Sequence, residues 1–419
     1  MLEDWYKEKR SILDFRRGPL GPHFDGFSDY LKERGYTIAY GKKLLGTCCQ
    51  FNAFLIEQRI GRCSKISQVM TEAFLKAFVA FAPTTHARFW PRLKVRAALN
   101  HLFTYLAKAK VCRLPRPKRV RKPYHWLLDR YLRHRRSEGK VTESTVRRDE
   151  RLLCAFLEPL GKDVQHKRFK RLQPEKFEAF LKKHLQSSTE NPGYLASALR
   201  QFFRYCAAQQ LLSVDFSGLI PPVRRYRHAS IPKGMGDSDL ERVLTSIPQD
   251  TPAGARDYAI LALLTTYGIR GVSAAQLLLD DIDWQHSRIR IRAQKGGKEV
   301  LLPLIGAVGE AIVRYLPHRY SKSPFREVFL SAQAPFRPLR SEAISMIVHR
   351  HMERCGVKLP KGGVRTFRHS WAIRALAHDS AIKAIADVLG HRYLNTTFIY
   401  AKADLKSLRQ VAVPWPTGK

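Results

Sequence analysis

Two stretches in the first half of the chain share one run of apolar and polar positions. Residues 97–111 read AALNHLFTYLAKAKV and residues 197–212 read SALRQFFRYCAAQQLL, with alanine, leucine, phenylalanine and tyrosine at matching places. Both have the apolar spacing of amphipathic helices. Two upstream pairs of segments, each about 100 residues apart, match as well: 50–55 with 152–157 and 71–78 with 174–181. Duplication of a small helical domain would leave this pattern, although amphipathic helices also look alike by chance.

Two stretches rich in proline and arginine interrupt the helical pattern and predict domain boundaries. The first, RLPRPKRVRKP at 113–123, is typical of an extended, charged linker. The second lies within IPPVRRYRHASIPKGMG at 220–236. We therefore expect a helical domain over 1–112, a linker over 113–123, a second helical domain over 124–222 and a linker over 223–235.

After the second linker, the pattern changes from helices alone to helices with a small sheet. Residues 287–304, SRIRIRAQKGGKEVLLPL, alternate apolar and polar positions before a Gly-Gly turn, which predicts a β-hairpin. Residues 328–331, VFLS, are predicted to form a third strand. The expected fold is a multidomain chain. Two α-helical domains precede a mixed α+β domain over 236–405, mostly helical with a small antiparallel sheet, and a tail over 406–419 follows.

Composition and charge narrow the class of protein. With 44% hydrophobic and 11% aromatic residues, the chain of 419 residues is typical of globular domains. Its 74 lysines and arginines against 36 acidic residues give a formal net charge of +38, which predicts a polyanionic partner, nucleic acid or an anionic membrane. The membrane alternative is weaker, because the apolar run at 257–269 is shorter than the roughly 20 residues of a spanning helix.

The cell compartment is predicted from the start of the chain and from its cysteines. The first residues, MLEDWYKEKRS, are charged where a signal peptide would turn apolar. The seven cysteines form no CxxC pair and have no histidine partner at zinc spacing. We therefore expect reduced thiols in a cytoplasmic protein.

Four short pieces of the C-terminal domain hold polar residues that local folding does not require. They are TYGIRG (266–271), QKGGK (294–298), RTFRHS (365–370) and LGHRYLNTTFIY (389–400). Taken singly, each has an ordinary explanation: a helix stop, a solvated hairpin tip, arginine stems over apolar surface and a core tyrosine. Their order and spacing are more informative, since Tyr400 follows His391 by nine residues.

In this order, the four pieces resemble the signature of the tyrosine recombinase (phage integrase) family. That signature is an arginine after a glycine turn, a lysine in a hairpin, a His-x-x-Arg pair, a Leu-Gly-His and a tyrosine about nine residues later. The resemblance covers 236–405 strongly and 124–222 more loosely, as the family's helical core-binding domain. Residues 1–112 would then be an extra copy of that kind of module.

The resemblance implies a role for each residue. Arg270 and Arg368 would clamp the scissile phosphate, for which guanidinium groups are suited because they stay charged and donate in pairs. His391 would donate a further hydrogen bond. Tyr400 would attack the phosphorus to give a 3′-phosphotyrosine, and Lys295 would protonate the leaving 5′-oxygen. The resemblance implies neither a metal nor a cofactor, because fixed cations stabilise the charge that develops.

Two positions depart from the family's pattern. Arg365 stands where relatives usually have histidine or lysine, and a guanidinium cannot accept the tyrosine proton. We expect a slower enzyme rather than an inactive one, unless water or another side chain replaces the base, and we expect Arg365→His to raise the cleavage rate. Ser273 stands where many relatives have a carboxylate that holds the first arginine, which leaves open what orients Arg270. Asp280 and Asp281 match the loop into the hairpin, where they would cap or turn.

Basic residues outside the four pieces are expected to bind double-stranded DNA at recombination or transposon-end sites. In the family, the helical and catalytic domains close around the duplex and the linker between them crosses it. The predicted contacts are Arg116, Lys118, Arg119, Arg121 and Lys122 in the first linker, Arg147, Arg148 and Arg151 on a helix, and Arg224 and Arg225 in the second linker. Such contacts give salt-dependent affinity and set the register of the protein on the duplex.

Recombination needs four strand cuts, so the resemblance implies a homo-oligomer on DNA, with a dimer at each site and a tetrameric synapse. Sister recombinases are further expected partners, and the bacterial nucleoid is the expected location. Three functions stay open at this point. They are a recombinase serving as integrase or transposase of a mobile element, a catalytically weak accessory subunit that binds DNA while a partner cuts, and a relaxing enzyme like the type IB topoisomerases.

Overall fold

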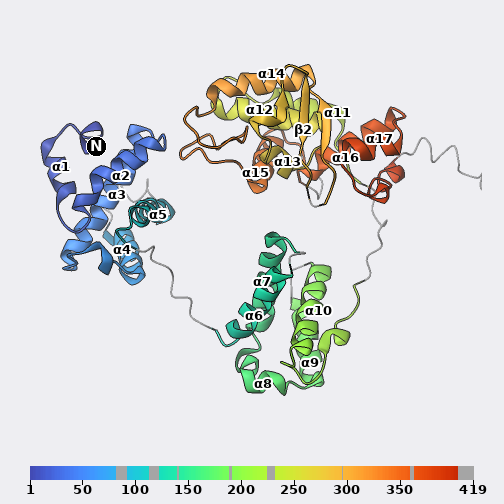
Figure 1. Cartoon of the computed structure of the whole chain (residues 1–419), viewed down its shortest axis with the longest axis horizontal. Coiled ribbons are helices and arrows are strands. Elements are labelled where there is room, and N and C mark those ends of the chain that lie inside the picture. Colours follow the sequence, from blue (N-terminus) through green and yellow to red (C-terminus); the bar gives the residue numbers. More distant parts are fainter. Residues whose placement is uncertain are drawn as a thin grey trace, which may run out of the picture. The chain divides into compact units, whose positions relative to one another are not determined.

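The protein is mostly helical in a computed structural model (Figure 1). The structure describes residues 1–81, 92–112, 122–138, 141–187, 191–223, 232–294, 296–358 and 363–403. Helices alone make up the N-terminal half, and a small antiparallel sheet joins the helices of the C-terminal domain, which confirms the predicted fold class. Among the residues described, no helix is both long and apolar enough to cross a membrane.

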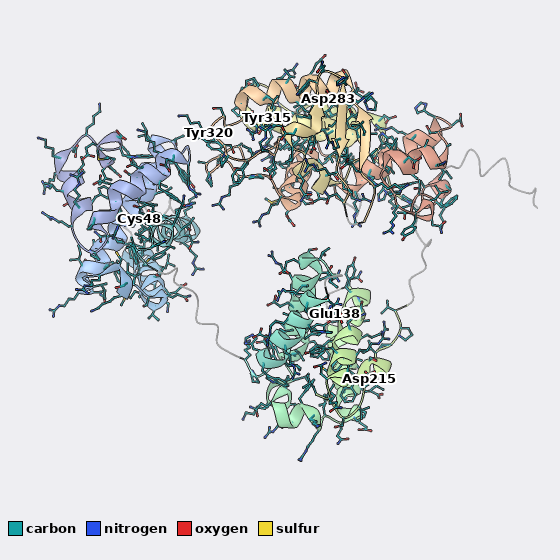
Figure 2. The ribbon with its side chains drawn as sticks, in the orientation of Figure 1. Cys48, Glu138, Asp215, Asp283, Tyr315 and Tyr320 are labelled. Carbon is teal, nitrogen blue, oxygen red and sulfur yellow. The ribbon has the colours of Figure 1, made fainter. Side chains whose placement is uncertain are left out.

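The N-terminal helices bury one shared core. They are α1 (Lys9–Arg16), α2 (Phe24–Glu33), α3 (Ile38–Glu57), α4 (Gln68–Phe81) and α5 (Arg92–Lys108). α3 begins after Thr37, whose hydroxyl accepts a hydrogen bond from the backbone N–H of Tyr40. Cys48, labelled in Figure 2, lies in this core, and burial raises the pKa of its thiol. All seven cysteines are free thiols in the structure.

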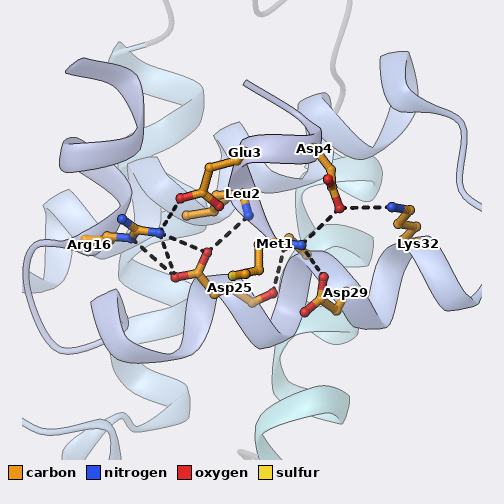
Figure 3. Close-up of polar contacts among 9 residues, drawn as sticks. Met1, Leu2, Glu3, Asp4, Arg16, Asp25, Asp29 and Lys32 are labelled. Carbon is orange, nitrogen blue, oxygen red and sulfur yellow. Dashed lines mark hydrogen bonds and ion pairs between the residues drawn. The ribbon is translucent and has the colours of Figure 1, made fainter. Parts of the chain in front are cut away.

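A polar network ties the first residues to α1 and α2 (Figure 3). The amino group of Met1 pairs with Asp4 at 3.1 Å and also with Asp29 of α2. Arg16 of α1 pairs with Asp25 of α2 at 3.2 Å. Because these side chains are partly or fully exposed, the pairs orient the helices more than they stabilise the fold.

Residues 117–227 form a compact unit of their own. Its helices are α6 (His125–Ser137), α7 (Glu143–Leu157), α8 (His166–Lys170), α9 (Pro174–Ser187) and α10 (Pro192–Ala208). α10 has a strong start, because Pro192 occupies its first turn and the Asn191 side chain accepts from the N–H of Gly193 at 3.1 Å. The apolar faces of these helices enclose a separate core.

The two helical modules repeat one aromatic packing geometry. In the first module, the rings of Phe51 and Phe103 lie 5.9 Å apart at 81°. In the second, the rings of Phe156 and Phe203 lie 6.1 Å apart at 82°. An edge-to-face pair therefore recurs between α3 and α5 and between α7 and α10.

A tyrosine pair repeats in the same way. Tyr30 and Tyr105 lie 5.5 Å apart in the first module, and Tyr131 and Tyr205 lie 5.3 Å apart in the second. The buried positions of α3 fall on those of α7 when Phe51 is placed on Phe156. The sequence match of 50–55 with 152–157 instead aligns Phe54 with Phe156. This segment of the predicted repeat is therefore one helical turn out of register.

The C-terminal domain surrounds one buried helix, α12. Its helices are α11 (Asp237–Thr245), α12 (Pro252–Tyr267), α13 (Gly271–Ala275), α14 (Gly306–Tyr315), α15 (Ser341–Arg354), α16 (Arg365–Ala377) and α17 (Ile382–Val388). α12 is buried on all sides and packs against α14 and α16. It begins after Thr251, whose hydroxyl accepts from Gly254 N–H at 3.1 Å.

The predicted hairpin is present, and the predicted third strand is wrong. Strands β1 (Ile282–Asp283), β2 (Arg288–Ile291) and β3 (Val300–Pro303) form an antiparallel sheet in that order, with Ile289 opposite Leu302. The third strand is thus β1 and not residues 328–331. That segment is apolar because it is buried, and it bonds to loops: Val328 N–H donates to the Leu277 carbonyl at 2.8 Å.

A buried ionic cluster joins α12 to α15. Asp257 is 1% exposed and accepts from Arg256 at 2.7 Å and from His351 at 3.0 Å, and it also pairs with Arg350. Burial raises the pKa of Asp257, but the hydrogen bond from His351 and the charges of the two arginines outweigh burial and lower it. Arg256 also donates to the Leu330 carbonyl at 3.1 Å, which ties the 328–331 segment to α12.

Candidate active site

Arg368 joins the ends of two helices. It lies in the first turn of α16 and is 7% exposed. Its guanidinium donates to the Gly268 carbonyl at 3.1 Å and to the Leu389 carbonyl at 2.6 Å. These carbonyls lie just past the C-termini of α12 and α17, where the helix supplies no partner. A guanidinium has five N–H donors, so donors remain for a ligand after these two bonds.

Gly268 makes the turn that positions Arg270. It ends α12 in the left-handed region with a φ of 58°, and a Cβ there would lie 2.9 Å from the Cβ of Trp371. Arg270 follows as the N-cap of α13. Burial lowers its pKa, Tyr400 opposes this and Arg365 lowers the pKa further, so the three side chains act on one another.

The imidazole ring of His391 is held by a hydrogen bond with Thr397. It is 7% exposed, and its Nδ1 lies 2.7 Å from the Thr397 hydroxyl. Burial and the charges of Arg368 and Arg270 lower the pKa of His391 to about 4. The ring is therefore neutral at physiological pH, with Nε2 left to face a ligand.

The β2–β3 hairpin lies close to Arg270 and to the turn before His391. A Cβ on Gly297 would lie 2.7 Å from the Gly390 carbonyl and 3.8 Å from Arg270 Nη1. The hairpin backbone therefore packs against the turn that precedes His391 and beside the first arginine. Lys295, the predicted general acid, lies outside the described residues.

Tyr400 lies inside its own domain and is 2% exposed. It belongs to a buried apolar cluster with Ala372, Leu376, Ile385 and Leu389. Its hydroxyl lies 3.1 Å from His369 Nδ1, and the neighbouring Arg368 acts on it to lower its pKa. The predicted nucleophile thus meets the second predicted arginine within one chain.

Arginine side chains bring positive charge close to Tyr400. Among the described residues, no carboxylate forms an ion pair with Arg270, Arg365 or Arg368. Burial and the neighbouring Arg270 lower the pKa of Arg368 to about 10, while Tyr400 opposes this shift. Burial raises the pKa of Tyr400, although the two arginines oppose it. Cations without local counterions around one hydroxyl make a site for an oxyanion such as a phosphodiester.

The two residues that depart from the family's pattern differ in burial: Arg365 is exposed and Ser273 is buried. Arg365 is exposed at the start of α16, close enough to influence Arg270 and His369. Ser273 is 8% exposed, and its backbone N–H donates to the Arg270 carbonyl at 2.8 Å. Asp281 pairs with Arg292 and accepts from Leu278 N–H at 3.0 Å, a turn role of the kind expected for it.

Most of the predicted DNA contacts in the linkers, Arg116, Lys118, Arg119, Arg121, Arg224 and Arg225, lie outside the described residues. Lys122 pairs with Glu158. On α7, Arg147 is 73% exposed and pairs with Glu143 at 3.6 Å. Arg148 is 33% exposed, pairs with Asp149 at 3.3 Å and lies over the Tyr194 ring. Arg151 is exposed.

Sequence reasoning left two contacts of this site unassigned. His369 was visible directly after Arg368, but its position there does not reveal that its ring meets Tyr400. Thr397 lies six residues after His391, a spacing that does not by itself predict a hydrogen bond between them. Their proximity depends on how α16 and the segment after α17 pack.

The chain is similar to known proteins over most of its length. The model of the phage integrase family matches residues 235–406. The chain is 31% identical over 404 residues, 95% of each sequence, to "Putative integrase/recombinase y4rA" of Sinorhizobium fredii. Two solved structures share the fold. One is XerH site-specific recombinase bound to palindromic difH substrate, with a TM-score of 0.52 and 19% identity over 71% of this chain and 98% of that one. The other is the Tn1549 transposon integrase in complex with a circular intermediate DNA, with a TM-score of 0.51 and 15% identity over 70% of this chain and 100% of that one.

Proposed function

The chain belongs to the phage integrase family of tyrosine recombinases, and on this premise we propose that it cuts and rejoins double-stranded DNA through a 3′-phosphotyrosine at Tyr400. The observation that carries the proposal is that buried Tyr400 lies beside buried Arg368, with Arg270 near enough to act on both side chains. Attack by the Tyr400 oxygen would add negative charge to the phosphate, and cations beside the oxygen would stabilise that charge.

Each residue has a proposed role. Arg270 and Arg368 bind the non-bridging oxygens of the scissile phosphate, and His391 donates from Nε2 to the same group. Lys295, on the hairpin that packs beside Arg270, protonates the leaving 5′-oxygen. The energy of the phosphodiester is kept in the phosphotyrosine, so a DNA hydroxyl can reverse the step. We propose that neither metal nor ATP takes part, which activity in EDTA without nucleotide would test.

DNA binding is supported by the net charge of +38. The solved relatives are DNA complexes, and we propose that this chain also binds duplex DNA, as a dimer at each site and a tetramer in the synapse. Binding of this kind weakens steeply with salt. Light scattering with one and then two DNA sites would test the assembly.

We propose that the N-terminal module is a second DNA-binding module. The repeated aromatic pairs, Phe51 with Phe103 and Phe156 with Phe203, support common descent of the two modules. A second module would lengthen the footprint on DNA. A chain lacking residues 1–112 that protects the same length of duplex would contradict this.

The test of the reaction is covalent trapping. A duplex that the full-length chain selects from a random library is nicked at successive positions, so that the strand end diffuses away after cleavage. We expect a protein–DNA adduct on a denaturing gel. Tyr400→Phe should abolish the adduct, whereas Tyr393→Phe, in an exposed tyrosine of the same segment, should leave it intact.

A second function is favoured by Arg365, which occupies the position of the family's usual base. The chain would then be an accessory subunit that binds DNA while a sister recombinase cuts. Binding with no adduct, where a known relative forms one, would support this role. Relaxation of supercoils by a monomer would instead indicate a topoisomerase-like enzyme.

An integrase or transposase role in a mobile element is the proposed biological setting. It is supported by the similarity to the integrase/recombinase of Sinorhizobium fredii. A reporter that scores excision and integration between two selected sites in cells would test it, and joining of neither kind would contradict it.

A further inference from the structure

We propose that His369 accepts the proton of the Tyr400 hydroxyl during strand cleavage, as the base that Arg365 cannot be. This inference rests on the proposed phosphotyrosine reaction and names the proton acceptor at the same site.

The neighbours of the Tyr400 hydroxyl favour one direction for its proton. The hydroxyl oxygen lies 3.1 Å from His369 Nδ1, and the ring centroids are 5.5 Å apart at 58°. Arg368, which carries only donors, lies beside the same hydroxyl and lowers its pKa. A neighbour that can only donate favours the arrangement in which the tyrosine oxygen faces the arginine and its single proton points to His369. The histidine then carries its own proton on Nε2.

The charge state of His369 suits a proton acceptor. Burial and the charges of Arg365 and Arg368, both on its own helix, lower the pKa of its ring. The group that faces it from the C-terminal segment is Tyr400, which is neutral before reaction. The lone pair of Nδ1 is therefore available at neutral pH. A bound phosphodiester brings negative charge that opposes the arginines, so the ring becomes more basic when DNA is present.

Other candidates for the base are occupied or unsuited. Arg365 is exposed and stays charged. Nδ1 of His391 is engaged by Thr397, and its pKa of about 4 makes it a weak acceptor. Among the described residues, His369 is the one neutral imidazole in contact with the tyrosine oxygen.

The step balances with the groups already named. The Tyr400 oxygen forms a bond to phosphorus as the bond from phosphorus to the 5′-oxygen breaks, and the phenolic proton moves to His369 Nδ1. The 5′-oxygen takes a proton from the acid, the role proposed for Lys295. On rejoining, the DNA hydroxyl attacks, and His369 returns the proton as the tyrosine leaves.

The test compares adduct formation on the nicked duplex across pH. His369→Asn keeps a polar atom near the position of Nδ1 without its basicity, and His369→Ala removes the ring. His378→Asn, at the exposed end of the same helix, is the matched control. We expect both His369 variants to slow the adduct about 100-fold or more at pH 7.5, with DNA affinity within about twofold of wild type. The fall of the wild-type rate at low pH should vanish in them, and added imidazole should partly restore His369→Ala.

The outcomes separate the two proposals. Wild-type rate and pH profile in His369→Asn would overturn this inference alone, whereas no adduct from the wild-type chain overturns the proposed reaction as well. A second measurement needs no DNA. Nitrogen NMR of the free full-length chain should show His369 protonated at Nε2, with an Nδ1 signal that shifts in Tyr400→Phe. A proton on Nδ1 would overturn the inference.

Discussion

His391 and Thr397 are joined by a hydrogen bond of 2.7 Å between Nδ1 and Oγ1, and both side chains are buried. The bond engages Nδ1 and holds the ring, whose pKa is lowered by burial and by the charges of Arg368 and Arg270. Thr397→Val keeps the shape and removes the bond, which is worth about 1 kcal/mol net. We expect cleavage to fall about tenfold with DNA affinity unchanged, and Thr397→Ser to stay near wild type. Equal rates for the two variants would show that the bond does not orient His391.

The pKa of His391 predicts a loss of stability in acid. It is about 4 in the folded chain and near 6.5 in an unfolded one. Between these values the unfolded chain binds more protons, so stability falls as pH drops from about 6.5 toward 4. Urea unfolding should show a smaller loss over this range in His391→Gln than in the wild type. A duplex bearing the phosphate should raise the pKa of His391, which NMR titration would detect.

Arg368→Lys is expected to damage both cleavage and folding. One ammonium cannot reach the carbonyls of Gly268 and Leu389 together, and a buried carbonyl without a partner costs about 1–3 kcal/mol. Cleavage should fall about 100-fold or more. Arg374→Lys is the control, since Arg374 lies on the same helix and donates to the Thr265 carbonyl at 2.8 Å. If both variants cleave equally, the guanidinium of Arg368 has no role at the phosphate.

Asp257→Asn should destabilise the C-terminal domain by about 3–5 kcal/mol, because it leaves buried Arg256 without its counterion. Asp283→Asn is the matched control. Asp283, labelled in Figure 2, is exposed and pairs with His286 at 2.8 Å. Its loss should cost less than about 1 kcal/mol. Urea unfolding measures both, and similar costs would contradict a structural role for the buried cluster.

Arg365→His should raise the cleavage rate, and more so when His369 is replaced. In the chain carrying His369→Asn, a new imidazole four residues earlier on α16 supplies the missing base. In the wild-type background the gain should be smaller, because His369 already acts. Rates of the two single variants and the double variant give the coupling directly. A fall of more than about tenfold in Arg365→His alone would contradict the account that Arg365 slows cleavage because it cannot act as a base.

Much of the catalytic domain follows from the sequence, because short-range patterns govern it. The alternation of Ile289 and Ile291 predicts the hairpin, and Gly268 predicts the turn before Arg270. Residues 328–331 were misjudged because a buried loop and a strand have the same apolar composition. The register of α3 was misjudged for a related reason. Phe51 and Phe54 lie one turn apart on the same helical face, so either could match Phe156.

The contacts that tune the site were beyond the sequence. Arg368 bonds to two backbone carbonyls, and a carbonyl has no residue type to mark it. The contact of His369 with Tyr400 depends on side-chain orientation across elements 31 residues apart. Family resemblance supplied the residues of the site, whereas packing supplied their partners.

Tyr400 is buried in a cluster of aliphatic side chains, which holds its ring in place without a ligand. Ordering a side chain costs conformational entropy, and for Tyr400 this entropy is lost when the domain folds. If Tyr400 is the nucleophile, as proposed, its oxygen would meet the phosphodiester already ordered, and more of the free energy of DNA binding would be available for distorting the duplex.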